Sequence, residues 1–129
     1  MKLDALTEII IGLAIKIHRN LGPGLLESVY QAALAYELQK AGIPFEKEKE
    51  LPVRYENILL DIGFRCDFLI DKRIIVECKA TREITEIDQA QVLNYLKIAD
   101  IRIGFLINFN EILLKDGLKR LANKYNDNE

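Results

Sequence analysis

The segment "RCDFLIDKRIIVECK" (65–79) reads as an apolar β-hairpin with charges gathered at one end. Residues two apart on a strand point to the same face of a sheet. With a three-residue turn (71–73), Asp67 lies directly opposite Glu77. With a two-residue turn, Asp67 lies opposite Val76, which sets charges against core positions. The apolar pattern therefore favours the three-residue turn.

The favoured register predicts one apolar face and one charged face. It places Cys66 and Cys78 side by side, and we expect them as packed thiols rather than as a disulfide. The apolar face carries Phe64, Cys66, Phe68, Ile70, Ile74, Val76, Cys78 and Ala80, and the other carries Arg65, Asp67, Leu69, Ile75, Glu77 and Lys79, with Arg65 opposite Lys79.

Two carboxylates that face each other across a strand pair repel. A divalent cation between Asp67 and Glu77 removes this repulsion, and Mg²⁺ is usually held by one or two carboxylates, waters and phosphate oxygens. A lysine beside such a site can stabilise phosphate charge or position an attacking water. The alternative is a solvated sheet face on which Arg65 and Lys79 neutralise the acids, because an E-x-K spacing by itself is a weak motif.

The rest of the chain predicts an α/β domain with the order α-α-β-β-β-α-β. Apolar spacing indicates two helices, and glycine and proline end each of them. Thr85 and Asp88 resemble a capping box at the start of a third helix. The expected elements are helices over 4–19, 25–40 and 85–100, and strands over 45–55 with a break at Pro52, 63–70, 74–79 and 101–109. A turn and a short return strand are expected within 56–61.

The C-terminal segment 111–125 has two interpretations. Asp116-Gly117 between apolar residues suggests a hairpin, whereas "GLKRLANKY" (117–125) is also compatible with a last helix. The basic residues of this segment either form a local patch or belong to a solvated charged face. They are Lys115, Lys119, Arg120 and Lys124.

Length and composition limit the class of protein. A chain of 129 residues is most simply one domain, 1–129, with its core over about 25–109. A net charge of −2 gives no global basic field. Two cysteines and one histidine exclude a disulfide framework and a His-rich metal site. The charged N-terminal segment 1–22 is neither a signal peptide nor a membrane span, so we expect a cytoplasmic protein without membrane contact.

Asp67 and the following Glu77-Cys78-Lys79 resemble the D…(D/E)-x-K signature of the PD-(D/E)XK nuclease superfamily. The segment "GLLESVY" (24–30) resembles the motif of the GxxExxY protein family within it, through Gly24, Glu27 and Tyr30. The resemblance covers about 5–124, and further matches are "HRNLGPG" (18–24), "QVLNYL" (91–96) and "LINF" (106–109). It implies a restriction-endonuclease-like fold with a mixed central sheet flanked by helices.

The resemblance also implies a site. Asp67 and Glu77 would bind Mg²⁺ or Mn²⁺, with Glu27 and the backbone carbonyl of Cys78 as further ligands. Lys79 would assist the attacking water. The remaining site residues are Gln91, expected to orient the substrate or the lysine, and Tyr95, Tyr30, Arg65 and His18 as substrate-binding candidates.

Several of these residues have a purely structural interpretation. Glu27 is favoured in the first turn of a helix by the helix dipole, and His18 is favoured at a helix end for the same reason. Tyr30 and Tyr95 fit ordinary core packing. Gln91 fits a solvated helix face.

The expected function is Mg²⁺-dependent hydrolysis of phosphodiester bonds in nucleic acid, with DNA favoured and a homodimer possible. The alternative is a catalytically silent nuclease-fold module that binds nucleic acid or a protein. The net charge favours the silent module slightly, whereas the intact D…E-x-K favours the enzyme. A metal-stabilised interaction protein is a third option, which salt-dependent DNA binding would separate from the other two.

Overall fold

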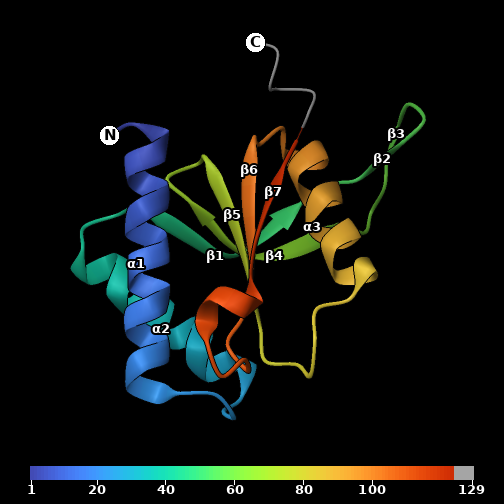
Figure 1. Ribbon diagram of the computed structural model, residues 1–129. Helices are drawn as coiled ribbons and strands as arrows, with labels where there is room; N and C mark the ends of the chain where they lie inside the picture. The colour runs from blue at the N-terminus through green and yellow to red at the C-terminus, as the bar shows by residue number, and fades with distance from the viewer. Residues whose placement is uncertain (124–129) are drawn as a thin grey trace.

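The computed structural model describes residues 1–123 (Figure 1). The predicted order of elements is confirmed, the turn and return strand expected at 56–61 belong to a small separate hairpin, and a last strand follows the one expected at 101–109. The helices are α1 (Leu3–Leu21), α2 (Glu27–Lys40) and α3 (Glu86–Ala99), with a short 3₁₀ helix η1 (Leu114–Gly117). The strands are β1 (Phe45–Leu51), β2 (Arg54–Tyr55), β3 (Ile58–Leu59), β4 (Phe64–Ile70), β5 (Ile74–Lys79), β6 (Ile103–Asn108) and β7 (Leu118–Ala122).

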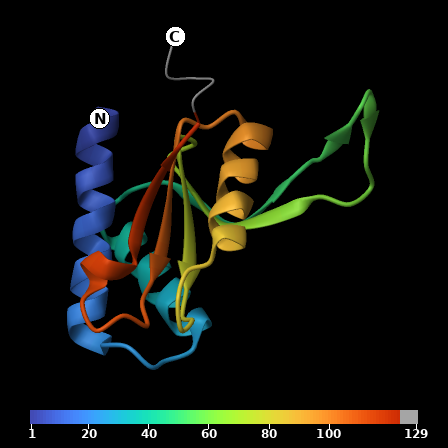
Figure 2. The same ribbon diagram turned by 45° about the vertical axis from the view of Figure 1, so that its right-hand side comes forward.

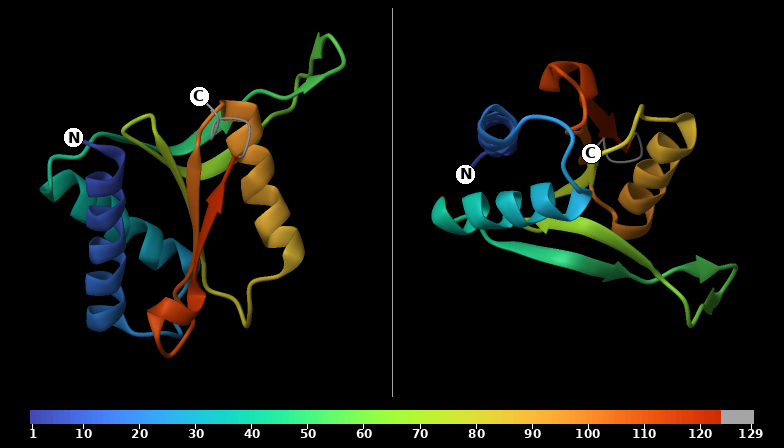
Figure 3. Two further views of the ribbon diagram at one scale, coloured as in Figure 1. Left: turned by 45° about the horizontal axis from the view of Figure 1, so that its top comes forward. Right: turned by 90° about the horizontal axis from the view of Figure 1, so that it is seen from below.

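The five long strands form one mixed sheet in the order β1-β4-β5-β6-β7. β5 and β6 run parallel, and the other neighbouring pairs are antiparallel. α1 and α2 cover one face of the sheet and α3 covers the other (Figure 3). The parallel pair needs a crossover connection, and α3 supplies it. This arrangement confirms the restriction-endonuclease-like α/β fold expected from the sequence.

The turn between β4 and β5 has three residues, as predicted. Ile70 pairs with Ile74, and Phe68 pairs with Val76. Asp71 takes a left-handed conformation (φ 52°) that aspartate tolerates better than most residues. Its Oδ2 atom accepts a hydrogen bond of 2.6 Å from Nη2 of Arg73, and this ion pair holds the turn closed.

The prediction of one continuous apolar face on β4 is wrong at its N-terminal end. Cys66 packs in the cluster beneath α3, whereas Phe68 packs in the cluster beneath α1 and α2. Between them, no ladder pair forms at Asp67, and the facing residue Glu48 of β1 is left-handed (φ 55°). A period of two presumes an even strand, and this one is distorted. Cys66 and Cys78 therefore lie in separate clusters as free thiols and do not pack against each other on one face.

The small hairpin of β2 and β3 projects from the body of the protein (Figure 2). β1 ends at Leu51, and Pro52 cannot donate a ladder hydrogen bond, so the strand breaks as predicted. Large apolar side chains lie exposed on and beside this hairpin. They are Tyr55, Ile58, Leu59, Leu60 and Ile62.

The C-terminal segment follows the hairpin interpretation, and its helix interpretation is wrong for the residues described. η1 leads into β7, which pairs antiparallel with β6. Lys119 and Arg120 are consecutive on β7 and so point to opposite faces, which argues against one basic patch. Lys124, the fourth residue of that predicted patch, lies outside the described residues. Within residues 1–123, no helix is long and apolar enough to cross a membrane.

Candidate active site

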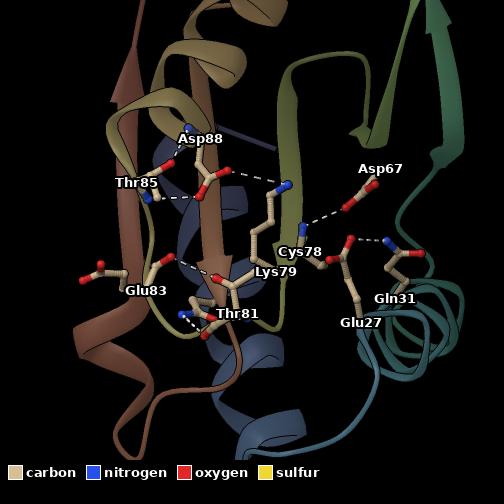
Figure 4. A network of polar contacts seen from close by, with 10 residues as sticks. Glu27, Gln31, Asp67, Cys78, Lys79, Thr81, Glu83, Thr85 and Asp88 are labelled. Atoms are coloured by element: carbon tan, nitrogen blue, oxygen red, sulfur yellow. Dashed lines mark hydrogen bonds and ion pairs between the residues drawn. The ribbon is translucent and has the colours of Figure 1, made fainter.

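Asp67 of β4 and Glu77 of β5 are joined by reciprocal hydrogen bonds between side chain and backbone. The backbone N–H of Asp67 donates to Oε1 of Glu77 (2.6 Å). The backbone N–H of Cys78 donates to Oδ2 of Asp67 (2.8 Å; Figure 4). The backbone ladder between the two strands has its last pair at Phe68–Val76. Beyond this pair, side-chain carboxylates replace backbone carbonyls as the acceptors between the two strands. Each carboxylate is thereby fixed to the backbone of the neighbouring strand.

Burial makes this acidic pair costly to ionise. The pKa of Glu77 is raised to about 8, first by burial and then by the negative charge of Asp67. The pKa of Asp67 is also raised, again mainly by burial, although the hydrogen bond from Cys78 acts in the opposite direction. A buried charge needs a partner. A cation bound beside the pair would therefore favour the ionised form of both carboxylates.

A third carboxylate approaches from α2. Glu27 is the first residue of that helix, and its pKa is raised by burial and then by Asp67. Its Oε1 atom accepts a hydrogen bond of 3.3 Å from the amide of Gln31, one turn along the helix. A hydrogen bond from the side chain of Gln31 also acts to lower the pKa of Asp67. Figure 4 shows the Glu27–Gln31 hydrogen bond beside Asp67.

Lys79 supplies a positive charge at the C-terminal end of β5, near the two carboxylates. Glu77 and Lys79 are two residues apart on β5 and so share a face. Nζ of Lys79 lies 4.0 Å from Oδ1 of Asp88, at the start of α3, and the two side chains are 19% and 22% exposed. The positive charge of Lys79 lowers the pKa of Asp67 and of Glu27. The ammonium group therefore interacts electrostatically with acids of α2, β4 and α3, namely Glu27, Asp67 and Asp88.

The donor set fits a hard divalent cation. Mg²⁺ is usually held by one or two carboxylates, with waters and substrate oxygens in its other positions. Asp67 and Glu77 provide such a pair, and the carbonyl of Cys78 points to the same side of its strand as the N–H that binds Asp67. Within residues 1–123, no group of three or more His, Cys, Asp or Glu side chains is arranged so that it could hold a metal ion by itself.

The two predicted residues of α3 lie along one face of that helix. Asp88, Gln91 and Tyr95 follow each other at helical spacing, and Asp88 faces Lys79. Tyr95 is 3% exposed and packs against Phe64, with ring centroids 5.4 Å apart. Burial and then the negative charge of Glu77 raise the pKa of Tyr95 to about 12. Its ring therefore forms part of the wall near the carboxylates.

Three predicted residues are placed in other surroundings. Tyr30 is fully buried, stacks on Phe109 with centroids 4.6 Å apart, and donates a hydrogen bond of 2.6 Å to the carbonyl of Gly22. His18 makes a 2.7 Å hydrogen bond through Nε2 to the carbonyl of Glu111.

Arg65 is exposed and pairs with Glu50 of β1. The β4–β5 ladder does not extend to the predicted pairing of Arg65 with Lys79. Arg65 stays a substrate-binding prediction, whereas the contacts of Tyr30 and His18 fit a structural role.

Sequence reasoning missed Gln31 and Asn108 and assigned Asp88 only to a helix cap. Asn108 is fully buried, and its amide group both accepts from and donates to the backbone of Thr81 (3.1 and 3.0 Å). It thereby fixes the loop that follows Lys79. Gln31 carried a usable signal, because it lies four residues after Glu27 on the same helix face. Asn108 carried only its position at the end of an otherwise apolar strand.

Comparison with known proteins places this geometry in a family. Residues 4–121 match the PD-(D/E)XK nuclease superfamily. The fold also resembles the crystal structure of SSO0001, with a TM-score of 0.50 and 20% sequence identity. That similarity covers 73% of this chain and 47% of the other, so the chain spans about half the length of that structure. No curated protein matches the chain. The chain belongs to the PD-(D/E)XK nuclease superfamily.

Proposed function

We propose that the protein is a Mg²⁺- or Mn²⁺-dependent nuclease that hydrolyses phosphodiester bonds of nucleic acid, with DNA as the favoured substrate. One observation carries the proposal. The carboxylates of Asp67 and Glu77 each accept a backbone hydrogen bond across β4 and β5, and Lys79 follows Glu77 by two residues on β5. The hydrogen bonds of these acids order the two strands, but a buried Glu77 beside a half-buried Asp67 is costly to ionise without a cation, and a metal-dependent hydrolase requires such a pair.

Asp67 and Glu77 would hold the cation, with the carbonyl of Cys78 and the carboxylate of Glu27 as further ligands. The cation, when bound, would neutralise phosphate charge and make a water molecule easier to deprotonate. Lys79 would stabilise the charge that develops on the phosphate and orient the attacking water. Gln91 would orient the substrate or Lys79, and Tyr95 would contact the substrate from α3.

We also propose membership of the GxxExxY protein family. Support comes from Glu27, which the motif places at the start of α2, beside the acidic pair. Tyr30 of the same motif ties the loop before α2 to the core, because its hydroxyl donates to Gly22 and accepts from the N–H of Leu25. The motif would then have two roles, one chemical and one structural.

The whole chain is proposed as one domain, in a reducing cytoplasm where the buried Cys66 and Cys78 stay as thiols. A homodimer is supported by the projecting hairpin of β2 and β3, because an isolated two-stranded hairpin with exposed apolar side chains is rarely stable in water. Sedimentation analysis of the wild type and Ile58→Asn tests the dimer. A dimer that the substitution dissociates supports it, and a wild-type monomer at high concentration refutes it.

The main alternative is a catalytically silent module that binds nucleic acid or a protein. A cleavage assay separates the two, with linear, branched and single-stranded DNA and RNA, Mg²⁺ or Mn²⁺, and excess EDTA as the metal-free arm. Asp67→Asn keeps an oxygen that can accept from the backbone N–H of Cys78 but removes the negative charge. Glu8→Gln, at an exposed position of α1, is the matched control. Metal-dependent cutting that Asp67→Asn abolishes and Glu8→Gln keeps supports the enzyme. DNA binding without cutting supports the silent module.

A further inference from the structure

The ammonium group of Lys79 lies near several carboxylates but forms an ion pair with one of them. Glu27, Asp67 and Glu77 all lie within electrostatic reach of it. Its only ion pair among the described residues is nonetheless with Asp88, at 4.0 Å. In Figure 4 the ammonium group of Lys79 is joined to Asp88 of α3, and Asp67 is seen on its other side. Of the acids around it, the lysine is therefore paired with Asp88 of α3 and not with an acid of the Asp67–Glu77 pair.

Asp88 is held rigidly by the start of its own helix. Its Oδ2 atom accepts a hydrogen bond of 3.0 Å from the backbone N–H of Thr85. Its own N–H donates to Oγ1 of Thr85 (3.1 Å), which completes the capping box. A capping box fixes the side chain that takes part in it. The remaining oxygen, Oδ1, therefore has a defined direction, and that direction is towards Lys79.

The backbone of Lys79 is fixed as well. Lys79 pairs with Asn108 in the parallel ladder, and its carbonyl accepts a hydrogen bond of 2.8 Å from the N–H of Phe109. Only the flexible four-carbon stem and the ammonium group remain to be placed. Without a second anchor, the ammonium group would be drawn towards the buried pair of Asp67 and Glu77, into the space that a cation needs.

We propose that Asp88 is a positioning residue for the hydrolytic reaction: its carboxylate, fixed by the capping box of α3, holds the ammonium group of Lys79 at the rim of the acidic pair. The inference rests on the proposed nuclease function, and it assigns to Asp88 a role in addition to capping. Lys79 is thereby kept available to the phosphate and kept out of the metal position.

The test separates this positioning role from capping and from the charge at the helix end. Asp88→Asn keeps an oxygen for the N–H of Thr85 but removes the ion pair. Asp88→Glu keeps both, since glutamate is the usual residue at this place in a capping box. Glu86→Gln removes a charge from the same helical turn at an exposed position and serves as the control.

The first readout does not depend on activity. In protein labelled with ¹⁵N at lysine Nζ, the Lys79 signal is assigned by its loss in Lys79→Arg. We expect a restricted Nζ in the wild type, Asp88→Glu and Glu86→Gln, and a mobile or shifted one in Asp88→Asn. An unchanged Lys79 signal in Asp88→Asn would overturn the proposal.

The second readout is steady-state cleavage. We expect Asp88→Asn to lower kcat about tenfold with little change in KM, and Asp88→Glu to restore most of it, because positioning acts on the reacting geometry. Equal losses in Asp88→Asn and Glu86→Gln would overturn the proposal in favour of a general helix-end charge effect. A wild type that cleaves nothing would refute the nuclease function and the reaction role together, while the Nζ signal alone still decides whether Asp88 holds Lys79.

Discussion

Asp67 and Glu77 each complete the backbone hydrogen bonding of the other's strand. Glu77 accepts from the N–H of Asp67 at 2.6 Å, and Asp67 accepts from the N–H of Cys78 at 2.8 Å. The two hydrogen bonds fix the directions of both carboxylates just beyond the last ladder pair of β4 and β5, Phe68–Val76. Both acids are therefore held at one place on neighbouring strands, as a metal-binding pair requires.

The acidic pair predicts that the metal-free protein loses stability as pH rises. The pKa of Glu77 is about 8 in the folded protein against 4.5 in the unfolded chain, so the folded state binds the proton more tightly. The stability that this proton supplies is complete below pH 4.5 and is lost as pH rises through about 8. The raised pKa values of Asp67 and Glu27 act in the same direction. Urea unfolding in EDTA at pH 5, 6.5 and 8 measures the trend.

Glu77→Gln tests the origin of this pH trend. The variant keeps a side-chain oxygen for the N–H of Asp67 but has no proton to lose. We expect it to be more stable than the wild type at pH 8 and to show a flatter pH dependence. Glu8→Gln, on the exposed side of α1, should follow the wild type. An equally steep decline in Glu77→Gln would show that the proton of Glu77 is not its cause.

Lys79 is predicted to serve the reaction rather than the cation. Lys79→Met removes a positive charge next to the acids, so Mg²⁺ affinity should be kept or increased. We expect kcat to fall by about 10²–10³, the usual cost of losing one charge-stabilising group. Lys79→Arg keeps the charge with a different shape and should recover only part of the rate. Calorimetry and cleavage kinetics on both variants measure this, and a Lys79→Met protein that loses Mg²⁺ binding would refute the assignment.

Tyr30 is predicted to stabilise the fold without touching substrate. Tyr30→Phe keeps the stacking on Phe109 but leaves the carbonyl of Gly22 and the N–H of Leu25 without their partner. Both hydrogen bonds are only partly buried, and losing a hydrogen bond of this kind costs about 0.5–1.5 kcal/mol of unfolding free energy. Denaturant unfolding should show this loss, while KM per folded enzyme stays unchanged. A raised KM with unchanged stability would restore Tyr30 as a substrate residue.

The sequence allowed the hairpin register to be predicted because the turn and the apolar pattern agree. A three-residue turn at 71–73 is the one that pairs apolar positions, and Ile70 does pair with Ile74. The local signals of α3 were also sufficient, since Thr85 and Asp88 form the predicted capping box. Both features depend on residues a few positions apart in the chain, where patterns are informative.

Tertiary contacts limited the rest. The faces of β4 change between Cys66 and Phe68, at the position where Glu48 of β1 is left-handed and no ladder pair forms. No pattern within β4 records that. Asp88 faces Lys79 only because α3 crosses back over the sheet to bring β6 beside β5. Each of these contacts joins elements that the sequence predicts one at a time.

The central claim is that Asp67 and Glu77 hold a catalytic divalent cation, and calorimetric titration of Mg²⁺ and Mn²⁺ into the metal-free protein tests it most directly. The titration is run at pH 6.5 and 8 on the wild type, Glu77→Gln and the control Glu8→Gln. The account predicts binding to the wild type and the control that strengthens at pH 8, as the Glu77 proton is lost, and that disappears in Glu77→Gln. Equal binding by the wild type and Glu77→Gln, or none by the wild type at either pH, would contradict it.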